Sequence, residues 1–188
     1  MMNNVVIDRK RIHFIKHFII KEDRLKMKER DLKGTCTQKI LLVKAGNPKH
    51  FREIYSWVIN ELKKQSLLLI PFPSTNKYKP QNKQLPFSLV KELCKRNKHL
   101  INGSGFLYRK YSLPKNTRDI NLQYKSLQLK NNKIIKNSNI LLLDDVVTTG
   151  SSLAAGMIKI KSIHPKSLQA MAIARKVYLK DVPKGGLF

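Results

Sequence analysis

Four short apolar runs along the chain predict buried β-strands. They are KILLV at 39–43, LLLI at 67–70, NILLL at 139–143 and SLQAMAIA at 167–174. LLLI is apolar at every position and NILLL at every position after the first, which suits strands that are covered on both faces, as in a parallel sheet. Pro71 and Pro73 end the second run, because proline cannot donate to a strand ladder.

The segments between these runs have the spacing of amphipathic helices. Apolar residues recur three and four positions apart through 49–64, again through 86–94, and again from Leu153 to a stop before Pro165. Strands that alternate with helices form right-handed crossovers, so the sequence predicts an α/β fold with a doubly wound, mostly parallel sheet. In such a fold ligands bind beyond the carboxyl ends of the strands.

The first part of the chain departs from this alternation. Residues 5–31 interleave apolar and basic side chains, and the spacing of Ile12, Ile15 and Ile19 predicts a basic amphipathic helix. Such a helix could dock on the fold, lie on a membrane or cap the core. We therefore expect a basic helical N-terminal extension at 1–38.

A second irregular stretch lies inside the remaining domain. Residues 102–137 are rich in Lys and Asn and contain Gly103, Gly105 and Pro114. This composition predicts a long mobile loop with one short strand at 106–108. The length of the chain favours a single domain after the extension, at 39–188.

Charge is the strongest feature of the composition. Lys and Arg number 38 against 12 Asp and Glu, which gives a formal net charge of +26. Such an excess attracts phosphates, nucleic acids and acidic membranes. Because the basic residues are mostly Lys and occur in nearly every segment, a biased genome composition explains them better than a nucleic-acid partner does.

Cysteine content and hydropathy indicate where the protein works. Cys36 and Cys94 form neither a CxxC pair nor a disulfide framework, which fits a reducing compartment and excludes a zinc ribbon built from them. No apolar run approaches the roughly 20 residues of a membrane span, and the start of the chain lacks the apolar core of a signal peptide. The expected location is the cytoplasm.

The candidate chemistry is concentrated in the stretch ILLLDDVVTTGSSL at 140–153, where an apolar strand runs into Asp144 and Asp145. A turn of small residues then opens the next helix: Thr148, Thr149, Gly150, Ser151 and Ser152. Unpaired backbone N–H groups and the helix dipole favour an anion at such a turn, and Gly150 lets the backbone approach it closely. Carboxylates beside a phosphate can accept hydrogen bonds from sugar hydroxyls and can hold Mg²⁺ directly or through water. The stretch therefore predicts a site for a ribose phosphate.

Two other interpretations of this stretch are weaker. Ser and Thr can merely cap a helix beside a solvated pair of acids, but the whole string is far more specific than a cap. A strand that ends in two acids also binds metal in nucleoside triphosphatases, yet the chain has no GxxxxGK[ST] loop to hold the phosphates.

The string resembles the phosphoribosyl-pyrophosphate motif of the type I phosphoribosyltransferases, which is an apolar strand, two acids, two apolar residues, T-T/A-G and a small polar residue. Within that superfamily the chain looks most like the ComF-type, competence-associated branch, because VKAGNPKHF, a helix and LLLIPFPS resemble its Lys-containing turn, helix and strand end. The resemblance covers 39–175 in element order and is close over 140–153. It implies a doubly wound, mostly parallel sheet of the type I phosphoribosyltransferase kind.

The resemblance also implies a role for each matched residue. Asp144 and Asp145 would be the catalytic carboxylates, would bind the ribose hydroxyls and would help to orient Mg²⁺. The 5′-phosphate would be cradled by Val147, Thr148, Thr149, Gly150, Ser151 and Ser152. The pyrophosphate loop would comprise Pro71, Phe72 and Pro73, with Lys44 as a further contact at a strand end. A flexible hood loop that closes on pyrophosphate would supply Arg109, Lys110 and Arg118.

The chain departs from the family pattern in three respects. It lacks the Cys-rich zinc module and the RGFNQ segment of ComF-like members, and has only PQNKQ at 80–84. Where purine-salvage members place an acidic residue against the base, the chain has Thr148, which argues against the hypoxanthine/guanine type.

These features predict two functions. As a phosphoribosyltransferase, a glycosyltransferase of the pentosyl-transferring kind, the protein would bind 5-phosphoribosyl 1-pyrophosphate with Mg²⁺ and transfer the phosphoribosyl group to a nitrogen base. As a non-catalytic ComF-like protein, it would act in DNA uptake by binding single-stranded DNA or a competence protein. A homodimer fits either function, and residues 5–31 alone suggest binding to a membrane surface.

Overall fold

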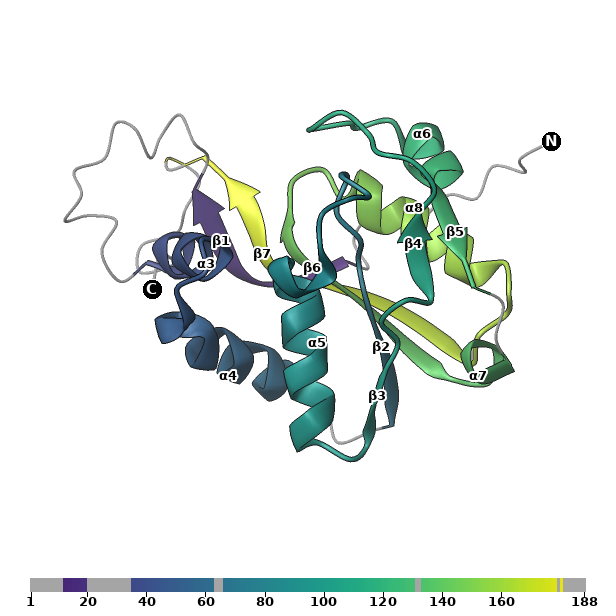
Figure 1. Ribbon diagram of the computed structural model, residues 1–188, viewed down its shortest axis with the longest axis horizontal. Helices are drawn as coiled ribbons and strands as arrows, with labels where there is room; N and C mark the ends of the chain where they lie inside the picture. The colour runs from purple at the N-terminus through teal and green to yellow at the C-terminus, as the bar shows by residue number, and fades with distance from the viewer. Residues whose placement is uncertain (1–11, 20–34, 63–65, 131–132, 179, 181–188) are drawn as a thin grey trace.

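A five-stranded parallel sheet forms the centre of the protein in a computed structural model that describes residues 12–19, 35–62, 66–130, 133–178 and 180 (Figure 1). Across the sheet the strands follow the order β1 (Ile12–Ile19), β7 (Ser167–Val177), β6 (Asn139–Val147), β2 (Leu67–Pro71) and β3 (Leu100–Asn102). Neighbouring strands pair in parallel throughout this order. A small antiparallel hairpin stands beside the sheet and consists of β4 (Leu107–Arg109) and β5 (Leu127–Leu129).

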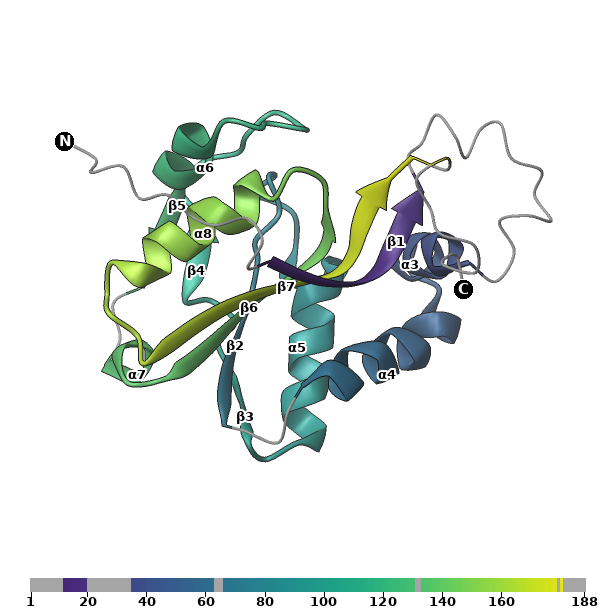
Figure 2. The same ribbon diagram turned by 180° about the vertical axis from the view of Figure 1, so that it is seen from behind.

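Helices cover both faces of the sheet (Figures 1 and 2). One face carries α3 (Cys36–Lys44), α4 (Phe51–Glu61) and α5 (Leu85–Arg96). The other face carries α8 (Ser151–Lys161), with α6 (Ile120–Ser126), α7 (Lys133–Lys136) and the hairpin around it. Two short 3₁₀ helices, η2 (Pro48–His50) and η3 (Gln81–Lys83), precede α4 and α5.

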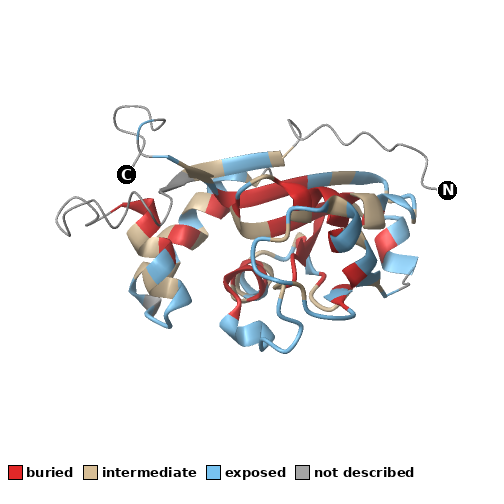
Figure 3. Cartoon of the chain, turned by 90° about the horizontal axis from the view of Figure 1, so that it is seen from above, coloured by how far each residue is buried: buried red, intermediate tan, exposed pale blue. Residues whose placement is uncertain are grey.

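The core consists of two apolar clusters that the sheet separates. Successive strand residues point to opposite faces, so Leu69 and Leu141 pack under α4 and α5 while Ile70 and Leu142 pack under α8. Figure 3 shows the buried residues concentrated along the sheet and on the inward sides of the helices. This two-sided burial explains the uninterrupted apolar runs Leu67–Ile70 in β2 and Ile140–Leu143 in β6.

The α/β architecture with its parallel sheet is confirmed. The predicted strands at 67–70, 139–143 and 167–174 correspond to β2, β6 and β7. The predicted helices at 49–64 and 86–94 correspond to α4 and α5, and the third predicted helix is α8. In each of these segments the spacing of the apolar residues is clear enough to distinguish a helix from a strand.

The prediction of a helix over 5–31 is wrong for the part of it that the structure describes. Residues 12–19 form β1, which pairs with β7 in parallel from Ile12 opposite Ala170 to Ile19 opposite Val177. The run IHFIKHFI is rich in Ile and Phe, which favour strands, and the edge of β7 offers it a complete ladder of hydrogen bonds. Residues 5–11 and 20–31 lie outside the described residues, and so does most of the predicted extension.

The prediction of a strand at 39–43 is also wrong, because these residues belong to α3. The side chain of Thr35 caps this helix by accepting a hydrogen bond from the backbone N–H of Gln38 at 3.2 Å. Cys36 and Ile40, four residues apart, form its buried side. A short apolar run fits a strand or a buried helix equally well. In this chain the hydrogen bond from Gln38 N–H to the Thr35 side chain stabilises the start of a helix.

The stretch at 102–137 is more ordered than predicted. The short strand expected at 106–108 is present one residue later as β4, but β5, α6 and α7 follow it. Residues 110–119 are the longest segment of this stretch without a helix or strand. No helix in the described part of the chain is long and apolar enough to cross a membrane.

Close packing of α8 against the sheet gives the first testable prediction. A Cβ atom at Gly156 would lie 2.8 Å from Leu142 Cδ2 and 2.8 Å from Phe72 Cε2, and both neighbours are buried. We expect Gly156→Val to lower the free energy of unfolding by about 1–3 kcal/mol, as overpacking does. Urea unfolding measures this loss. In the control Lys161→Val, at the exposed end of the same helix, the loss should stay within about 0.5 kcal/mol, and equal losses in the two variants would contradict the packing argument.

Candidate functional site

The carboxyl end of β6 lies at the point where the sheet reverses its winding. From β6 the chain passes through α8 to β7, its neighbour on one side in the sheet. From β2, the neighbour of β6 on the other side, the chain passes through α5 to β3, and α5 covers the opposite face of the sheet from α8. A crevice opens between two such strands because their connecting helices diverge, and ligands of α/β proteins bind there. Asp144 and Asp145 occupy this end of β6.

Two adjoining clefts occupy this crevice. The larger, of about 340 Å³, is named the turn cleft and is lined by the turn before α8 together with other residues: Thr75, Asn116, Thr117, Arg118, Gln123, Asp144, Val146, Val147, Thr148, Thr149, Gly150, Ser151, Ser152, Leu153 and Lys176. The second, of about 250 Å³, is named the carboxylate cleft and is lined by Lys44, Phe72, Pro73, Ser74, Thr75, Lys79, Gln84, Pro86, Arg109, Asp144, Asp145, Val146 and Ser152. The clefts share four lining residues, including Asp144. A ligand with two separated groups could therefore span both.

The turn that opens α8 has the geometry of an anion site. Gly150, the residue before the helix, has φ +78°, and a Cβ atom there would lie 2.9 Å from Ile12 Cδ1. Gly150 has no side chain that could cap the helix, while Thr149 Oγ1 accepts a hydrogen bond of 3.4 Å from the backbone N–H of Ser151. The hydroxyls of Thr149 and Ser151 lie 2.9 Å apart, within hydrogen-bonding distance, and both residues line the turn cleft. The other backbone N–H groups of the first turn, together with the helix dipole, favour a phosphate.

The two carboxylates are directed to different faces of the sheet. Leu142 packs on the α8 side and Leu143 on the α5 side, and this alternation directs Asp144 toward α8 and Asp145 toward α3. Asp145 Oδ2 lies 2.6 Å from Nζ of Lys44, the last residue of α3. The helix predicted as a strand therefore carries a cation to the site.

Burial raises the pKa of Asp144 well above its ordinary value of 3.8, and the negative charge of Asp145 adds to this rise. The backbone N–H of Asp145, which donates to Asp144 Oδ1 at 2.8 Å, opposes the rise, as do the charges of Lys44 and Arg109. Asp144 thus lies among one acid and two cations in a partly enclosed cleft.

Arg109 has a guanidinium group that is buried without a full set of partners. Its exposed fraction is 6%, and its Nη1 donates to Ser126 Oγ and, at 3.4 Å, to the carbonyl of Gln123. Among the described residues nothing accepts a hydrogen bond from its Nε or Nη2. Its guanidinium carbon lies 5.2 Å from the ring centre of Phe72, and burial lowers its pKa to about 10. Buried donors without acceptors are unfavourable. An anion in the carboxylate cleft would supply the acceptors that Arg109 Nε and Nη2 lack.

Two loops close over the clefts and are joined to each other. The backbone N–H of Leu113 donates to the carbonyl of Thr75 at 2.8 Å, and that of Lys77 donates to Ser112 Oγ at 3.1 Å. Lys77 Nζ also donates to the carbonyl of Lys110 at 3.1 Å. These bonds hold the segment that carries Asn116, Thr117 and Arg118 at the turn cleft.

Most of the residues that the sequence predicts for the site lie in these two clefts. The turn cleft receives Asp144, Val147, Thr148, Thr149, Gly150, Ser151, Ser152 and Arg118, and the carboxylate cleft receives Lys44, Phe72, Pro73, Arg109 and Asp145. Pro71 and Lys110 line neither cleft. Pro71 is buried in β2 opposite Leu143, and Lys110 is exposed outside the clefts. Arg109 ends a strand instead of lying in a flexible loop.

Sequence reasoning missed several polar residues of the clefts. Thr75, Gln84 and Gln123 lie far from the acid motif along the chain and carry no motif of their own. The Gln84 side chain accepts from the backbone N–H of Ser74 at 2.9 Å and donates to the carbonyl of Lys79 at 2.7 Å, so it shapes the 74–79 loop. Only the position of Thr75, two residues after Pro73, could have indicated its place in the site.

The described side chains of the site can supply Mg²⁺ with only a few of the oxygen ligands that it needs. No group of three or more metal-ligating side chains gathers within the described residues. Asp144 Oδ1, Asp145 Oδ1 and Asp145 Oδ2 are engaged by two backbone N–H groups and by Lys44, and in the described structure no such contact reaches Asp144 Oδ2. Mg²⁺ keeps several waters and is commonly held by one or two carboxylates plus the oxygens of a phosphate ligand. The Asp pair fits an ion of that kind.

The chain is similar to solved phosphoribosyltransferases. A hypoxanthine phosphoribosyltransferase from Staphylococcus aureus has 14% identity over 80% of each chain and a TM-score of 0.42. The hypoxanthine phosphoribosyl transferase of Trypanosoma cruzi has 16% identity over 78% of this chain and 69% of its own, with a TM-score of 0.45. The adenine phosphoribosyltransferase of Saccharomyces cerevisiae has 14% identity over 70% and 69%, with a TM-score of 0.44.

No protein-family model matches the chain, and no curated protein sequence does. The TM-scores lie below 0.5, so the interpretation of the two clefts depends on their own geometry.

The raised pKa of Asp144 predicts how stability depends on pH. Above pH 3.8 the folded state holds this proton more tightly than the unfolded state does, so the Asp144 contribution to the free energy of unfolding falls as pH rises. We expect Asp144→Asn to be more stable than wild type by about 1 kcal/mol at about pH 8, and this advantage to shrink toward about pH 4. Urea unfolding across this range measures it. A difference that does not change with pH would contradict the prediction.

Proposed function

We propose that the protein binds 5-phosphoribosyl 1-pyrophosphate and transfers its phosphoribosyl group to a nitrogen base. The observation that carries the proposal is the meeting of two acids at the end of β6 with the glycine-containing turn that opens α8, in two adjoining clefts. The acids suit the hydroxyls of a ribose, and the turn suits its 5′-phosphate.

In this proposal the donor lies across both clefts. Its 5′-phosphate accepts hydrogen bonds from the first turn of α8 in the turn cleft. Its ribose hydroxyls donate to Asp144 and Asp145, and its pyrophosphate extends along the carboxylate cleft toward Lys79 and Arg109. The unpartnered Nε and Nη2 of Arg109 support this direction, because they lack acceptors that pyrophosphate oxygens would supply.

In the proposed reaction, the bond between C1 of the ribose and the pyrophosphate oxygen breaks, and the pyrophosphate leaves with the electron pair. A bond forms between C1 and a nitrogen of the base, which loses its proton. Positive charge on the ribose is stabilised by Asp144 and Asp145, and negative charge on the leaving group by Arg109 and Lys79. When bound, Mg²⁺ supplies further positive charge to the pyrophosphate.

The assignment to the ComF-type branch is part of this proposal. It is supported by the order of a lysine before a turn, a helix, and a strand that ends at proline, which here are Lys44, α4 and Pro71. In this chain Lys44 ends a helix instead of a strand. A panel of nitrogen bases tested for pyrophosphate release would identify the acceptor.

Titration calorimetry with two ligands tests the donor site. We expect wild type to bind both 5-phosphoribosyl 1-pyrophosphate and ribose 5-phosphate. Arg109→Met should weaken the pyrophosphate ligand at least about tenfold, the scale of one lost charged hydrogen bond, and leave ribose 5-phosphate almost unchanged. Gly150→Ala should weaken both ligands, because a Cβ atom strains the left-handed turn and meets Ile12.

The control variant for this titration is Lys130→Met, beside β5 and outside both clefts. It should bind both ligands as wild type does, unless the net positive charge alone attracts them. If folded wild type binds neither ligand, or if Lys130→Met loses as much as Arg109→Met, the proposed function is wrong.

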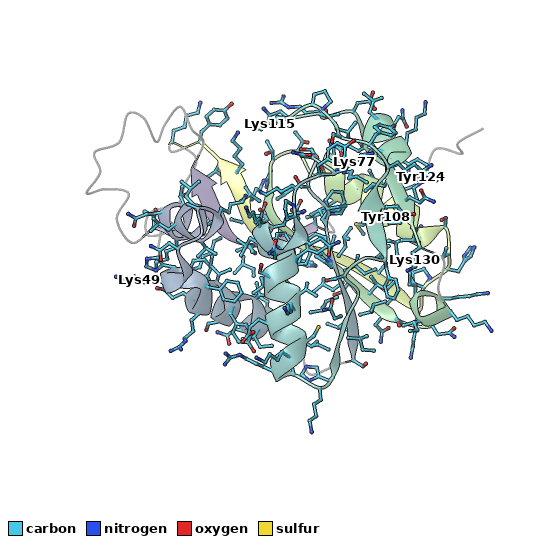
Figure 4. All side chains as sticks on the ribbon, in the orientation of Figure 1. Lys49, Lys77, Tyr108, Lys115, Tyr124 and Lys130 are labelled. Atoms are coloured by element: carbon cyan, nitrogen blue, oxygen red, sulfur yellow. The ribbon has the colours of Figure 1, made fainter. Side chains whose placement is uncertain are left out.

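A basic and aromatic surface favours single-stranded nucleic acid as a second candidate ligand. Tyr78, Tyr108 and Tyr111 are exposed by 78%, 37% and 42% on and beside β4. Lys77 lies 4.9 Å from the ring centre of Tyr78, and Figure 4 shows Lys77, Tyr108 and Lys130 on the same half of the molecule. Exposed rings among cations can stack with bases while lysines pair with phosphates. In this candidate function the protein would act in DNA uptake, with a competence protein as a further partner.

Fluorescence anisotropy with single-stranded DNA tests this surface. We expect Tyr78→Ala with Tyr108→Ala to weaken binding at least about thirtyfold, because stacking contributes about 1–3 kcal/mol for each base and two rings are removed. Binding should also fall steeply with salt, since each phosphate contact releases counterions. Lys49→Met, on the opposite half of the molecule in Figure 4, is the control for charge. If the tyrosine variant binds as wild type does, nucleic acid is attracted by charge alone and this second function is dropped.

A further inference from the structure

Each carboxylate of the Asp pair has a cation of the chain beside it. Asp145 is paired with Lys44 at 2.6 Å, and Arg109 lines the carboxylate cleft with Asp144 and favours its charged form. Lys79 lines the same cleft, so three cations accompany the two acids and the cleft carries no net negative charge. The site therefore lacks the excess of negative charge that attracts a divalent cation in the absence of a ligand.

The contact with Lys44 occupies the part of Asp145 that a metal ion would use. Asp145 Oδ2 faces Lys44, and Oδ1 accepts a hydrogen bond from the backbone N–H of Val146 at 2.6 Å. The Asp145 side chain is 19% exposed and the Lys44 side chain 33%, so the pair is partly shielded from water. A metal ion that binds Asp145 directly would have to displace an ammonium group already in place.

The wider field of the protein acts in the same direction. The net charge of +26 repels free divalent cations and attracts phosphates. Lys44 is also the last residue of α3, where the negative end of the helix dipole favours a cation. The helix thereby stabilises the ammonium group beside Asp145.

We propose that Lys44 takes the place of a divalent cation at Asp145, so that the site binds the ribose 5-phosphate part of its ligand without a resident metal ion. This inference rests on the proposed function and makes it more specific. A divalent ion then enters only together with a pyrophosphate group, whose oxygens supply most of its ligands. In the ligand-free protein Lys44 is a positioning residue, because it acts through Asp145.

An ordinary surface ion pair is the simpler interpretation of this contact. Exposed pairs contribute about 0–1 kcal/mol and are often dispensable. The place of Lys44 differs from such a pair, because its partner is one of two adjacent acids and both residues line the carboxylate cleft. The two interpretations differ in what happens to metal affinity when the lysine is removed.

The direct test is binding of Mn²⁺ alone, followed by the electron paramagnetic resonance signal of the free ion. Wild type should bind Mn²⁺ weakly, and Lys44→Met should bind it at least about tenfold more tightly, because one opposing charge close to the carboxylates is gone. The control is Lys83→Met, which removes a lysine from the neighbouring cavity of about 520 Å³ that Lys44 also lines. It should behave as wild type does.

A second measurement uses wild type only and does not depend on the folding of a variant. Calorimetric binding of ribose 5-phosphate should be the same with EDTA and with Mg²⁺, whereas 5-phosphoribosyl 1-pyrophosphate should bind several-fold more tightly with Mg²⁺. In a folded Lys44→Met variant, binding of ribose 5-phosphate should weaken in EDTA and recover in part when Mg²⁺ is added.

Several results would overturn the inference. One such result is equal Mn²⁺ affinity in wild type and Lys44→Met. Another is loss of ribose 5-phosphate binding to wild type when EDTA is added. Failure of the proposed function has a different signature, because in that case neither phosphoribosyl ligand binds under any condition. The Mn²⁺ titration would still decide whether Lys44 excludes a metal ion from the Asp pair.

Discussion

The position of β6 between β2 and β7 is the constraint on which the rest of the site depends. Helices cover β6 on both faces, so it must be apolar until the point where it leaves the core. Its first charged residues, Asp144 and Asp145, appear where the two crossover helices diverge. The turn into α8 follows at once, because α8 must return over the sheet to reach β7. The acids and the turn before α8 therefore lie together at the point where the chain leaves the sheet.

The site combines acidic and basic side chains, whereas the chain as a whole carries a large excess of positive charge. In a chain of net charge +26, the two acids at the end of β6 lie beside Lys44 and Arg109, which come from different faces of the sheet. A ligand for this site must therefore offer negative charge toward the turn and Arg109, and hydrogen-bond donors toward the acids. A sugar phosphate has both, whereas a bare anion or a bare cation has only one.

The central strands and the acid motif could be predicted from the sequence, because both are local patterns. LLLI is apolar at every position, NILLL is apolar after Asn139, and the DDVVTTGSS string carries its chemistry within one turn. The helix α3 and the strand β1 could not be predicted, since a short apolar run takes the form that its neighbours stabilise. The cations beside the acids could not be predicted either. One lysine among many carries no signal, and the partner of Lys44 lies about a hundred residues away along the chain.

The described structure keeps two unfavourable features that a protein without a ligand would have no reason to keep. Arg109 is buried with two of its donor groups unpartnered, and burial beside a second acid disfavours the charged form of Asp144. Each could be removed by a single neutral residue, at a gain of the order of 1 kcal/mol. The two features lie in one cleft, where two donor groups of Arg109 lack acceptors and, in the described structure, no hydrogen bond reaches Asp144 Oδ2. A ligand that carries both oxygen acceptors and hydroxyl donors would relieve both at once, as the phosphoribosyl ligand of the proposed function would, whereas inorganic phosphate would supply mainly acceptors.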